Sequence, residues 1–325
     1  MIRNMKNISK YRINDLKEIL FQNLPWISFI LIISIIFFIN PRYLSLYNIK
    51  NILSEIAPLL VGSIGLTFVI IIGSIDLSVG AIASAAAVCF AKLIFNFGYL
   101  AYFIVLLFGA VVGILNGIAF TKTKIPSFIL TLGTMSILAS FSLILSNSAA
   151  LSIGNNAKNY INWAEIYIFN LIPLQLLIAI FLLLIAYFIQ NYTSFGRRLF
   201  AIGSNEKVTF ISGINVDQVK IFIFTFCGIC AAFMGIFLAT KLRSGSPTVG
   251  DPFVLLIIAA VVMGGNAAGE GSVFRTLLGV SLTAILHNGL VVLGIDAFYQ
   301  DIVFGIIIII AIYLTVDKKQ GLIIK

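Results

Sequence analysis

Asp76 is the residue of this 325-residue chain that is best placed to do chemistry, because it lies between two apolar stretches with almost no loop around it. A carboxylate at membrane depth costs about 2.5–3.5 kcal/mol on insertion scales, so this position indicates a purpose or a short route to water. Ser74 and Ser78 can cap backbone N–H groups that a helix break would free, and Gly73 and Gly80 permit such a break. We therefore expect Asp76, Ser78 and Gly80 to line or gate a polar path. The alternative is that Asp76 only caps the helix that follows it.

Two asparagines, Asn116 and Asn288, lie inside other apolar stretches. Their amides suit contact with a hydroxylated solute, or hydrogen bonds between neighbouring helices. We add both to the candidate path or gate, with the purely structural role as the alternative. The small residues Gly109 and Gly113 belong to a G-x-x-x-G pattern, which predicts close helix packing instead.

No set of residues in the chain has the spacing of a catalytic or metal site. Cys227 and Cys230 form a C-x-x-C pair inside an apolar run, with no histidine or second cysteine pair close by, which predicts packing residues. His287 is the one histidine and cannot build a metal site alone. Phosphate-loop, G-x-S-x-G and zinc motifs are absent from the sequence. We expect a protein that is not an enzyme, has no cofactor and does not itself hydrolyse ATP.

The stretch 190–220 is the most polar internal segment and predicts a cytoplasmic loop. Ser204 or Asn205 is a suitable N-cap, and Gly213 suits the position after a helix, so a helix of about two turns is predicted between them. That short helix would expose both apolar and charged side chains. It suits docking to another protein, with a loop bound to lipid headgroups as the alternative.

The composition places most of this chain in lipid. Hydrophobic residues make up 60% of the sequence, charged residues 10%, and the mean hydropathy is +1.10. Soluble domains usually carry about 25% charged residues, which excludes a soluble enzyme, a disordered scaffold and a nucleic-acid binder for the whole chain. The net charge of +9 is explained by basic loops that face anionic headgroups.

Apolar runs of membrane-spanning length predict an all-α polytopic membrane protein with about ten transmembrane helices. We place the spans, of which the eighth is short, near Leu24–Asn40, Ile56–Gly73, Val79–Asn96, Leu100–Phe120, Ile125–Leu145, Leu171–Ile189, Ile221–Thr240, Pro252–Gly264, Val273–Leu293 and Phe298–Val316. Runs of consecutive isoleucines near the end exclude the alternation that a barrel requires.

Lysine and arginine positions predict the orientation. Most of the 21 basic residues fall in loops that are cytoplasmic if the N-terminus is inside, so both termini are expected in the cytoplasm. We divide the chain into a cytoplasmic amphipathic segment at 1–23, a transmembrane domain at 24–316 and a cytoplasmic tail at 317–325. The Asn-rich stretch 146–170 is the largest outer loop, and no signal-peptide cleavage pattern follows the first apolar run.

Two stretches of the chain are similar to each other. Leu107-Phe108-Gly109 followed by Asn116-Gly117 is similar to Leu277-Leu278-Gly279 followed by Asn288-Gly289. Glycine-rich breaks at 73–80 and 264–271 precede the two stretches. A true repeat would place the fourth span on the ninth in the opposite orientation, which is typical of transporters with broken helices and a substrate site near the midplane. Chance similarity is the alternative.

Several motifs in order resemble the membrane permeases of ribose-type ATP-binding-cassette (ABC) importers, over roughly residue 51 to the C-terminus. They are Ile75-Asp76-Leu77-Ser78-Val79-Gly80, Gly196-Arg197-Arg198, Gly203-Ser204-Asn205-Glu206, Ser212-Gly213-Ile214-Asn215, Ala259-Ala260-Val261-Val262-Met263-Gly264-Gly265 and Asn288-Gly289-Leu290. This chain departs from the family with Ser74 in place of a glycine and Glu270 in place of another. Both departures cast doubt on transferring a substrate preference.

The resemblance implies a permease subunit in a bacterial inner membrane that imports a monosaccharide or a related small polar solute. Its partners would be a second copy of itself, a tandem-domain ABC ATPase and an extracytoplasmic sugar-binding protein. The segment 203–215 would be the helix that couples to the ATPase, with Arg197, Arg198, Gly203, Asn205, Glu206 and Gly213 as the coupling residues.

Two other functions remain as alternatives at the level of the sequence. An ion-coupled secondary transporter would use Asp76 to carry a proton or sodium. A membrane enzyme or non-transporting scaffold is the third class, and the absence of a catalytic set counts against it. The sequence does not specify the solute or which helices line the path.

Overall fold

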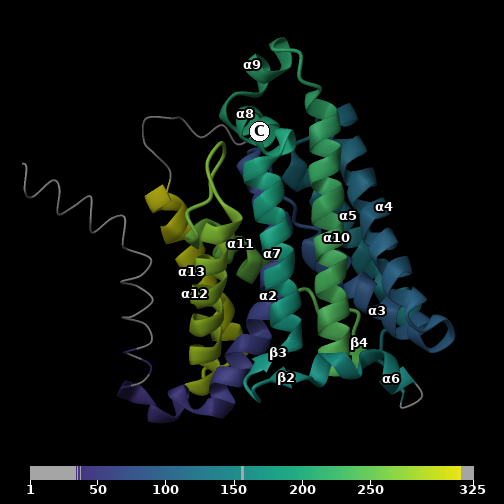
Figure 1. Ribbon diagram of the computed structural model, residues 1–325, viewed down its shortest axis with the longest axis vertical. Helices are drawn as coiled ribbons and strands as arrows, with labels where there is room; N and C mark the ends of the chain where they lie inside the picture. Colours follow the sequence, from purple (N-terminus) through teal and green to yellow (C-terminus); the bar gives the residue numbers. More distant parts are fainter. Residues whose placement is uncertain (1–33, 35, 37, 155–156, 316–325) are drawn as a thin grey trace, which may run out of the picture.

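The computed structural model describes residues 34, 36, 38–154 and 157–315, and helices dominate this part of the chain (Figure 1). The α-helices are α2 (Leu46–Ile71), α3 (Val79–Phe97), α4 (Leu100–Thr123), α5 (Ser127–Ser146), α6 (Lys158–Ile161), α7 (Leu174–Tyr192), α8 (Ser194–Ser204), α9 (Glu206–Ile211), α10 (Val216–Leu242), α11 (Phe253–Met263), α12 (Val273–Val292) and α13 (Ala297–Thr315). Among the described residues, seven helices are long and apolar enough to cross a membrane. The prediction of an all-α polytopic membrane protein is confirmed.

The predicted spans correspond closely to these helices. The pair 56–96 separates into α2 and α3, and the pair 100–145 into α4 and α5. The first predicted span, Leu24–Asn40, lies almost wholly outside the described residues, as do the predicted segments 1–23 and 317–325. Two short helices of the 3-10 type, η1 (Pro41–Leu44) and η3 (Asn162–Glu165), complete the helical elements.

Four short strands lie in the loops and tie distant segments together. β1 (Leu151–Ser152) pairs antiparallel with β4 (Ser244–Gly245), and β2 (Tyr167–Ile168) pairs antiparallel with β3 (Ile172–Pro173). An ion pair between Arg243 and Glu165 joins the same two parts of the chain. The loop after α5 is therefore fastened to the end of α10.

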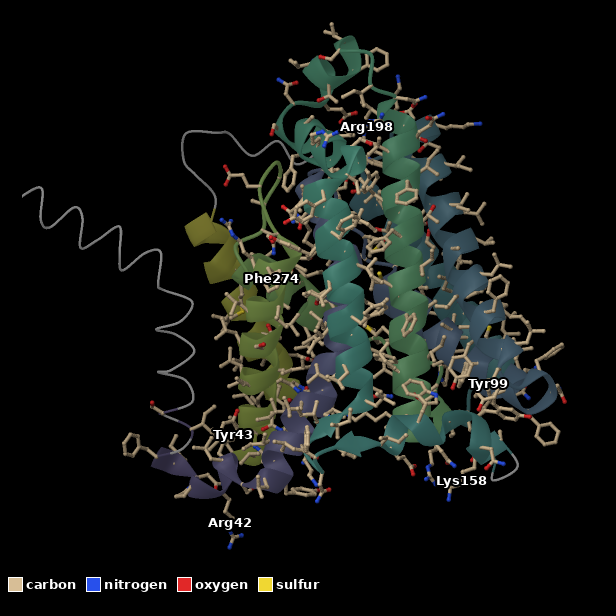
Figure 2. The ribbon with its side chains drawn as sticks, viewed as in Figure 1. Arg42, Tyr43, Tyr99, Lys158, Arg198 and Phe274 are labelled. Atoms are coloured by element: carbon tan, nitrogen blue, oxygen red, sulfur yellow. The ribbon has the colours of Figure 1, made fainter. Side chains whose placement is uncertain are left out.

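The predicted inner and outer loops gather at opposite ends of the molecule. α8 and α9 lie at one end, and η1, α6 and the four strands lie at the other (Figure 1). Arg198 marks the first end, and Arg42 and Lys158 mark the second (Figure 2). This arrangement is the one that the lysine and arginine pattern predicts, so we refer to the ends as inner and outer.

α10 is the central helix of the bundle and packs against α2, α3 and α4. Gly109 and Gly113 of α4 meet the backbone of α10 at Gly228 and Phe224, and a Cβ atom at either position would collide with a carbonyl oxygen. The predicted G-x-x-x-G packing face is confirmed, because such close approach is open only to small residues. Cys227 and Cys230 are buried on the face of α10 that meets α2, as predicted for packing residues.

Two connections between helices run as non-helical backbone into the bundle. One is the segment 72–78 between α2 and α3, where the sequence predicts a break. The other is the segment 243–252 between α10 and α11, which the sequence analysis missed. α11 has 11 residues and is about 16 Å long, roughly half of a 30 Å hydrocarbon core. The short eighth span is thus a half-helix preceded by a non-helical segment that consists mostly of turns.

The two similar stretches lie on helices that run in opposite directions. α4 begins at the outer end near Tyr99, and α12 begins nearer the inner end at Phe274 (Figure 2). The orientation agrees with an inverted repeat. The glycine-rich stretch 264–271 forms the turn between α11 and α12, and Gly265, Gly269 and Gly271 adopt positive φ angles there.

We expect the substitution Gly113→Leu to prevent most of the chain from folding, because the leucine would collide with the backbone of α10. The yield of monodisperse protein after detergent extraction measures this effect. Gly305→Leu is the matched control, because a Cβ atom at Gly305 of α13 meets nothing within 4 Å. Equal yields from the two variants would contradict the packing role of Gly113.

Candidate functional site

The non-helical segment 72–78 is held in place by hydroxyl groups of α5. The backbone N–H of Ile75 donates to Ser127 Oγ at 3.0 Å, and that of Leu77 donates to Thr131 Oγ1 at 3.0 Å. Backbone groups inside a membrane must find partners within the protein, because lipid offers none. α5 thereby supplies the hydrogen bonds that a continuous helix would have made.

Asp76 lies at the centre of this segment and is 1% exposed. Its Oδ1 accepts hydrogen bonds from the backbone N–H of Ser78 at 2.9 Å and from Ser78 Oγ at 2.6 Å. Its Oδ2 is buried and has no hydrogen-bond partner among the described residues, although Cys227 of α10 is close enough to interact with it electrostatically. One carboxylate oxygen therefore caps the turn before α3, and the other is buried near Cys227.

A chain of hydrogen bonds extends from Asp76 across three helices. Asn116 Nδ2 of α4 donates to Ser78 Oγ at 3.0 Å, and Thr134 Oγ1 of α5 donates to Asn116 Oδ1 at 2.6 Å. Both Ser78 and Asn116 are buried. Three of the five predicted path or gate residues thus form one polar network within an apolar bundle. We call Asp76, Ser78, Asn116 and Thr134 the midplane network.

The remaining two predicted residues lie outside this network. Gly80 is in the first turn of α3 and packs against the backbone of Gly250, where a side chain would collide with the Gly250 carbonyl. Asn288 of α12 accepts a hydrogen bond from Asn48 Nδ2 at 2.8 Å. Asn48 also donates to the carbonyl of Tyr43 at 2.9 Å, so Asn288 takes part in bonding between α12 and the start of α2. The structure does not bring Asn288 together with Asp76.

A second polar cluster joins the outer parts of α2 and α12. His287 forms an ion pair with Glu55, and the hydroxyl of Tyr43 donates to the carbonyl of Ile285 at 2.8 Å. Burial, together with the nearby charge of Glu55, raises the pKa of Tyr43 to about 12. Tyr43 therefore stays a neutral hydrogen-bond donor. This cluster fastens η1 to α12, and no group of metal-ligating residues is found among the described positions.

At the inner end, α8 and α9 form the predicted helical loop. Asn205 is the N-cap of α9 and accepts from the backbone N–H of Val208 at 3.2 Å. Gly213 follows the helix with φ +83°, a conformation that favours glycine. Arg197 and Arg198 are exposed on α8. The prediction of a short capped helix between Asn205 and Gly213 is confirmed.

Gly203, near the end of α8, lies where three segments meet. A Cβ atom there would collide with the carbonyl oxygen of Ile71 and lie 2.5 Å from the backbone nitrogen of Gly269. Gly269 itself donates its backbone N–H to the Ile71 carbonyl at 2.8 Å. α8 is therefore in direct contact with the end of α2, immediately before the segment that carries Asp76.

Glu206 forms an ion pair within the chain, and its role in coupling stays a prediction. Its Oε1 lies 2.7 Å from Nζ of Lys220, and the side chain of Lys220 is only 10% exposed. The pair joins α9 to the first turns of α10. Glu206 thus orients the short helix, while the side chains of Val208, Phe210 and Ile211 on α9 remain exposed.

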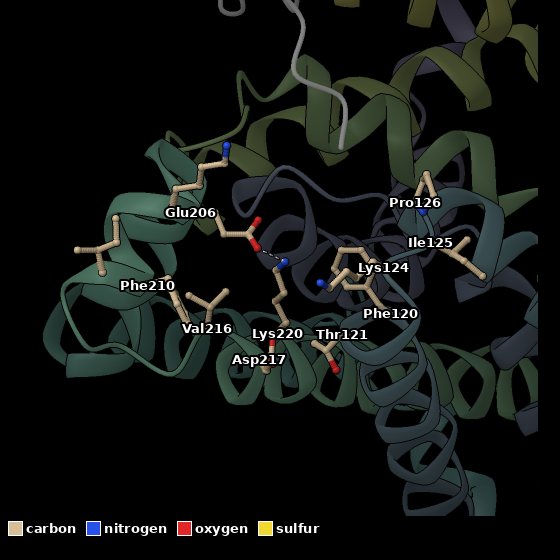
Figure 3. A pocket seen from close by; sticks show the side chains of 12 residues that line it. Phe120, Thr121, Lys124, Ile125, Pro126, Glu206, Phe210, Val216, Asp217 and Lys220 are labelled. Carbon is tan, nitrogen blue, oxygen red and sulfur yellow. Dashed lines mark hydrogen bonds and ion pairs between the residues drawn. The ribbon is translucent and has the colours of Figure 1, made fainter.

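A pocket of about 720 Å³ opens beside α9 (Figure 3). It lies between α9, the start of α10 and the connection from α4 to α5. Its lining residues are Phe120, Thr121, Lys124, Ile125, Pro126, Glu206, Lys207, Phe210, Ile211, Val216, Asp217 and Lys220. The mixture of apolar and charged side chains at the inner end suits a protein surface as a partner better than a small solute.

Comparison with known proteins identifies the family. Residues 48–312 match the family described as the permease component of the branched-chain amino acid transport system. The ribose import permease protein RbsC of Bacillus subtilis (strain 168) is 36% identical over 302 residues, covering 91% of this chain and 92% of that protein. The chain belongs to this permease family.

Other relatives also match this permease over most of both chains. The probable ABC transporter permease protein YphD of Escherichia coli (strain K12) is 37% identical over 314 residues, which cover 94% of each chain. The D-allose transport system permease protein AlsC of the same strain is 31% identical over 290 residues, 87% of this chain and 88% of that protein. No solved structure gives a significant match.

The sequence analysis of the permease missed the hydroxyl groups of α5. Ser127, Thr131 and Thr134 follow each other at helical spacing, so they lie on one face of α5. Three hydroxyls on one face of an apolar helix are a signal that the sequence carries. Ser127 and Thr131 bond backbone N–H groups of the segment 72–78. These N–H groups are free to bond only because the segment is not helical.

We expect Thr131→Val to destabilise the permease by about 1–3 kcal/mol, because it leaves the buried N–H of Leu77 without an acceptor. Thermal unfolding in detergent measures the loss. Thr225→Val is the matched control, because the hydroxyl of Thr225 bonds the carbonyl of Ile221 within its own helix. An unchanged melting temperature for Thr131→Val would show that α5 does not hold the segment.

Proposed function

We propose that this permease is the membrane-spanning subunit of an ABC importer that moves a monosaccharide or related small polar solute into the cytoplasm. The observation that carries the proposal is the midplane network, which places a buried carboxylate beside a break in the bundle. Polar groups at this depth are costly, and they mark solute pathways more often than structural sites. Relatives whose names specify ribose and D-allose transport support a sugar as the solute.

Asp76, Ser78 and Asn116 act in this proposal as a gate across the path. Their side chains satisfy one another while the gate is closed, apart from Oδ2 of Asp76. A solute with several hydroxyl groups can replace these hydrogen bonds as it passes, because carboxylate and amide groups accept and donate to hydroxyls. Gly80 allows the close approach of the chain behind the gate.

The ATPase docks on the inner end, where α9 exposes its apolar side chains beside the pocket. Arg197 and Arg198 contribute charge to the same surface. Movement of α8 and α9 reaches the gate through Gly203, which contacts the end of α2. The chain thus needs no nucleotide site of its own, and a tandem-domain ABC ATPase supplies the free energy of ATP hydrolysis.

A second copy of the chain completes the path in this proposal. Gly133, Ser136 and Ser140 form an exposed stripe on α5, and small residues on a membrane helix are typical of helix–helix interfaces. α5 also holds the segment with Asp76, so a path between two copies would pass beside the gate. A sugar-binding protein delivers the solute at the outer end. The basic loops favour both termini in the cytoplasm, and bacterial relatives such as RbsC and YphD support a bacterial inner membrane.

Purification of the tagged permease from its own membranes tests this function. A tandem-domain ATPase in stoichiometric amount, with vanadate-sensitive activity, is the expected result. A chain that purifies without an ATPase, under conditions that keep known transporter complexes intact, would instead favour the ion-coupled alternative. The family relatives count against that alternative, because RbsC and YphD are named as import or ABC permeases.

We expect Asp76→Asn to reduce solute uptake by about tenfold or more while membrane insertion stays normal, because a charged acceptor is lost from the gate. ATP-dependent uptake into proteoliposomes that contain the ATPase measures the effect. Asp296→Asn is the matched control, since Asp296 is exposed at the start of α13. Normal uptake by the Asp76 variant would show that Asp76 only caps the helix and has no role in transport.

We expect Phe210→Asp combined with Ile211→Asp to abolish co-purification of the ATPase, because these side chains are 69% and 82% exposed on α9. Phe169→Asp is the control, since Phe169 is 92% exposed at the outer end. Glu206→Ala should weaken docking less, because Glu206 only orients α9 through its ion pair with Lys220. If the ATPase is retained by the double variant, the docking surface lies elsewhere.

A further inference from the structure

The non-helical segment 243–252 enters the bundle from the outer end and lies against α3. A side chain at Gly245 would collide with the carbonyl of Ala87, and one at Gly250 would collide with the carbonyl of Gly80. Gly80 and Ala87 are separated by about two turns of α3, or roughly 10 Å. The segment therefore advances about 10 Å toward the inner end before α11 begins.

The depth of the turn at 248–251 follows from its neighbours. Gly250 lies against Gly80 and Ala83, and Ala83 packs against Gly235 of α10, about 10 Å before the outer end of that helix. From this level α11 runs about 16 Å to Gly264, which packs against the first turn of α12. Since a hydrocarbon core is about 30 Å thick, the turn lies near the middle of the bilayer.

Part of this turn is exposed on the surface of the chain. Thr248, Asp251 and Pro252 are all exposed, although they lie at membrane depth. Non-helical backbone at this depth is tolerated only where it is buried in protein or lines a water-filled cavity. An ionised carboxylate that faces lipid would add a cost of several kcal/mol. The exposed side of the turn therefore needs water or protein beside it instead of lipid.

Asp251 is only loosely tied to the rest of the protein. Ser84 Oγ accepts from the backbone N–H of Gly250 at 2.8 Å and makes a long hydrogen bond of 3.4 Å to Asp251 Oδ1. Because Ser84 is buried, it anchors the backbone of the turn, while the residue Asp251 stays exposed. The start of α11 two residues later partly offsets the negative charge through its dipole.

We propose that Asp251 is a solute-contacting residue on the water-filled side of the transport path, and that its carboxylate binds hydroxyl groups of a polyhydroxylated solute. This inference rests on the proposed function, because the solute class comes from it. Charge-assisted hydrogen bonds from hydroxyls to a carboxylate are short and strong, and two oxygens can accept from two adjacent hydroxyls. Thr248, on the same turn, adds a hydroxyl beside it.

The contact between Gly80 and Gly250 joins this site to the gate. Gly80 follows Asp76 and Ser78 at the start of α3, and Gly250 immediately precedes Asp251. The turn at 248–251 thus meets the first turn of α3 at two glycines, two residues after the end of the segment 72–78. A shift of α3 that opens the gate would also move the turn that carries Asp251. One solute would then contact the exposed carboxylate of Asp251 and the buried carboxylate of Asp76 in succession.

Thiol labelling tests the water-facing position without relying on transport. Cys89 is replaced by alanine, and Cys227 and Cys230 stay because they are buried. Asp251→Cys or Thr248→Cys is then introduced, and the holo-transporter in proteoliposomes is treated with a charged, membrane-impermeant thiol reagent. Phe181→Cys is the control, since Phe181 is exposed on the apolar surface of α7. We expect both turn positions to react at least tenfold faster than position 181.

Equal, slow labelling at 248, 251 and 181 would overturn the inference, even if the wild-type protein imports sugar. Fast labelling together with a wild type that shows no ATP-dependent uptake would instead contradict the proposed function. The Thr248→Cys variant keeps Asp251, so the test survives if the Asp251 variant fails to fold.

Solute contact itself is tested with Asp251→Asn and labelled D-ribose, D-allose and D-galactose. We expect the KM for the transported sugar to rise about tenfold while the maximal rate changes less than twofold, because an acceptor for solute hydroxyls is weakened. The transported sugar should also slow the labelling of Thr248→Cys. An unchanged KM, without protection by any of the three sugars, would overturn the role of Asp251.

Discussion

The structure depends on one constraint, that every backbone polar group inside the membrane needs a partner within the protein. Helices meet this requirement by themselves, but the segments 72–78 and 243–252 do not. α5 supplies Ser127 and Thr131 to the first segment, and α3 supplies Ser84 to the second. The hydroxyl groups that make non-helical backbone tolerable therefore also lie beside the proposed polar path.

Close packing of small residues makes this arrangement compact enough to exclude lipid. α4 and α10 meet at glycines, and α3 meets the segment 243–252 at Gly80 and Gly250. Since lipid chains are as apolar as leucine, contact between membrane helices depends on such packing and on hydrogen bonds across helices. Close backbone contacts therefore lie beside the midplane network, and we expect a modest displacement of one helix to change the hydrogen bonds of the proposed gate.

The sequence could predict the spans and the central acid, because both signals are local. Long apolar runs define the helices, and Asp76 between two glycines defines a break. Asp76, Ser78 and Asn116, all predicted as path residues, lie together, whereas Asn288 bonds to Asn48 in a separate place. That difference depends on which helices touch, and periodicity within one helix carries no information about its neighbours.

The segment 243–252 was missed because its composition is ambiguous. Pro247, Gly250 and Pro252 would suit an outer loop as well as a buried turn, and only the contacts with α3 place it at depth. At that depth, the carboxylate of Asp251 needs different surroundings from those of a loop residue. In a loop this carboxylate would be an ordinary solvated charge, but near the midplane it requires water or protein beside it in place of lipid. The exposure of Asp251 therefore favours a water-accessible face on the chain. Asp76 is buried in this state, and its carboxylate does not lie on that face.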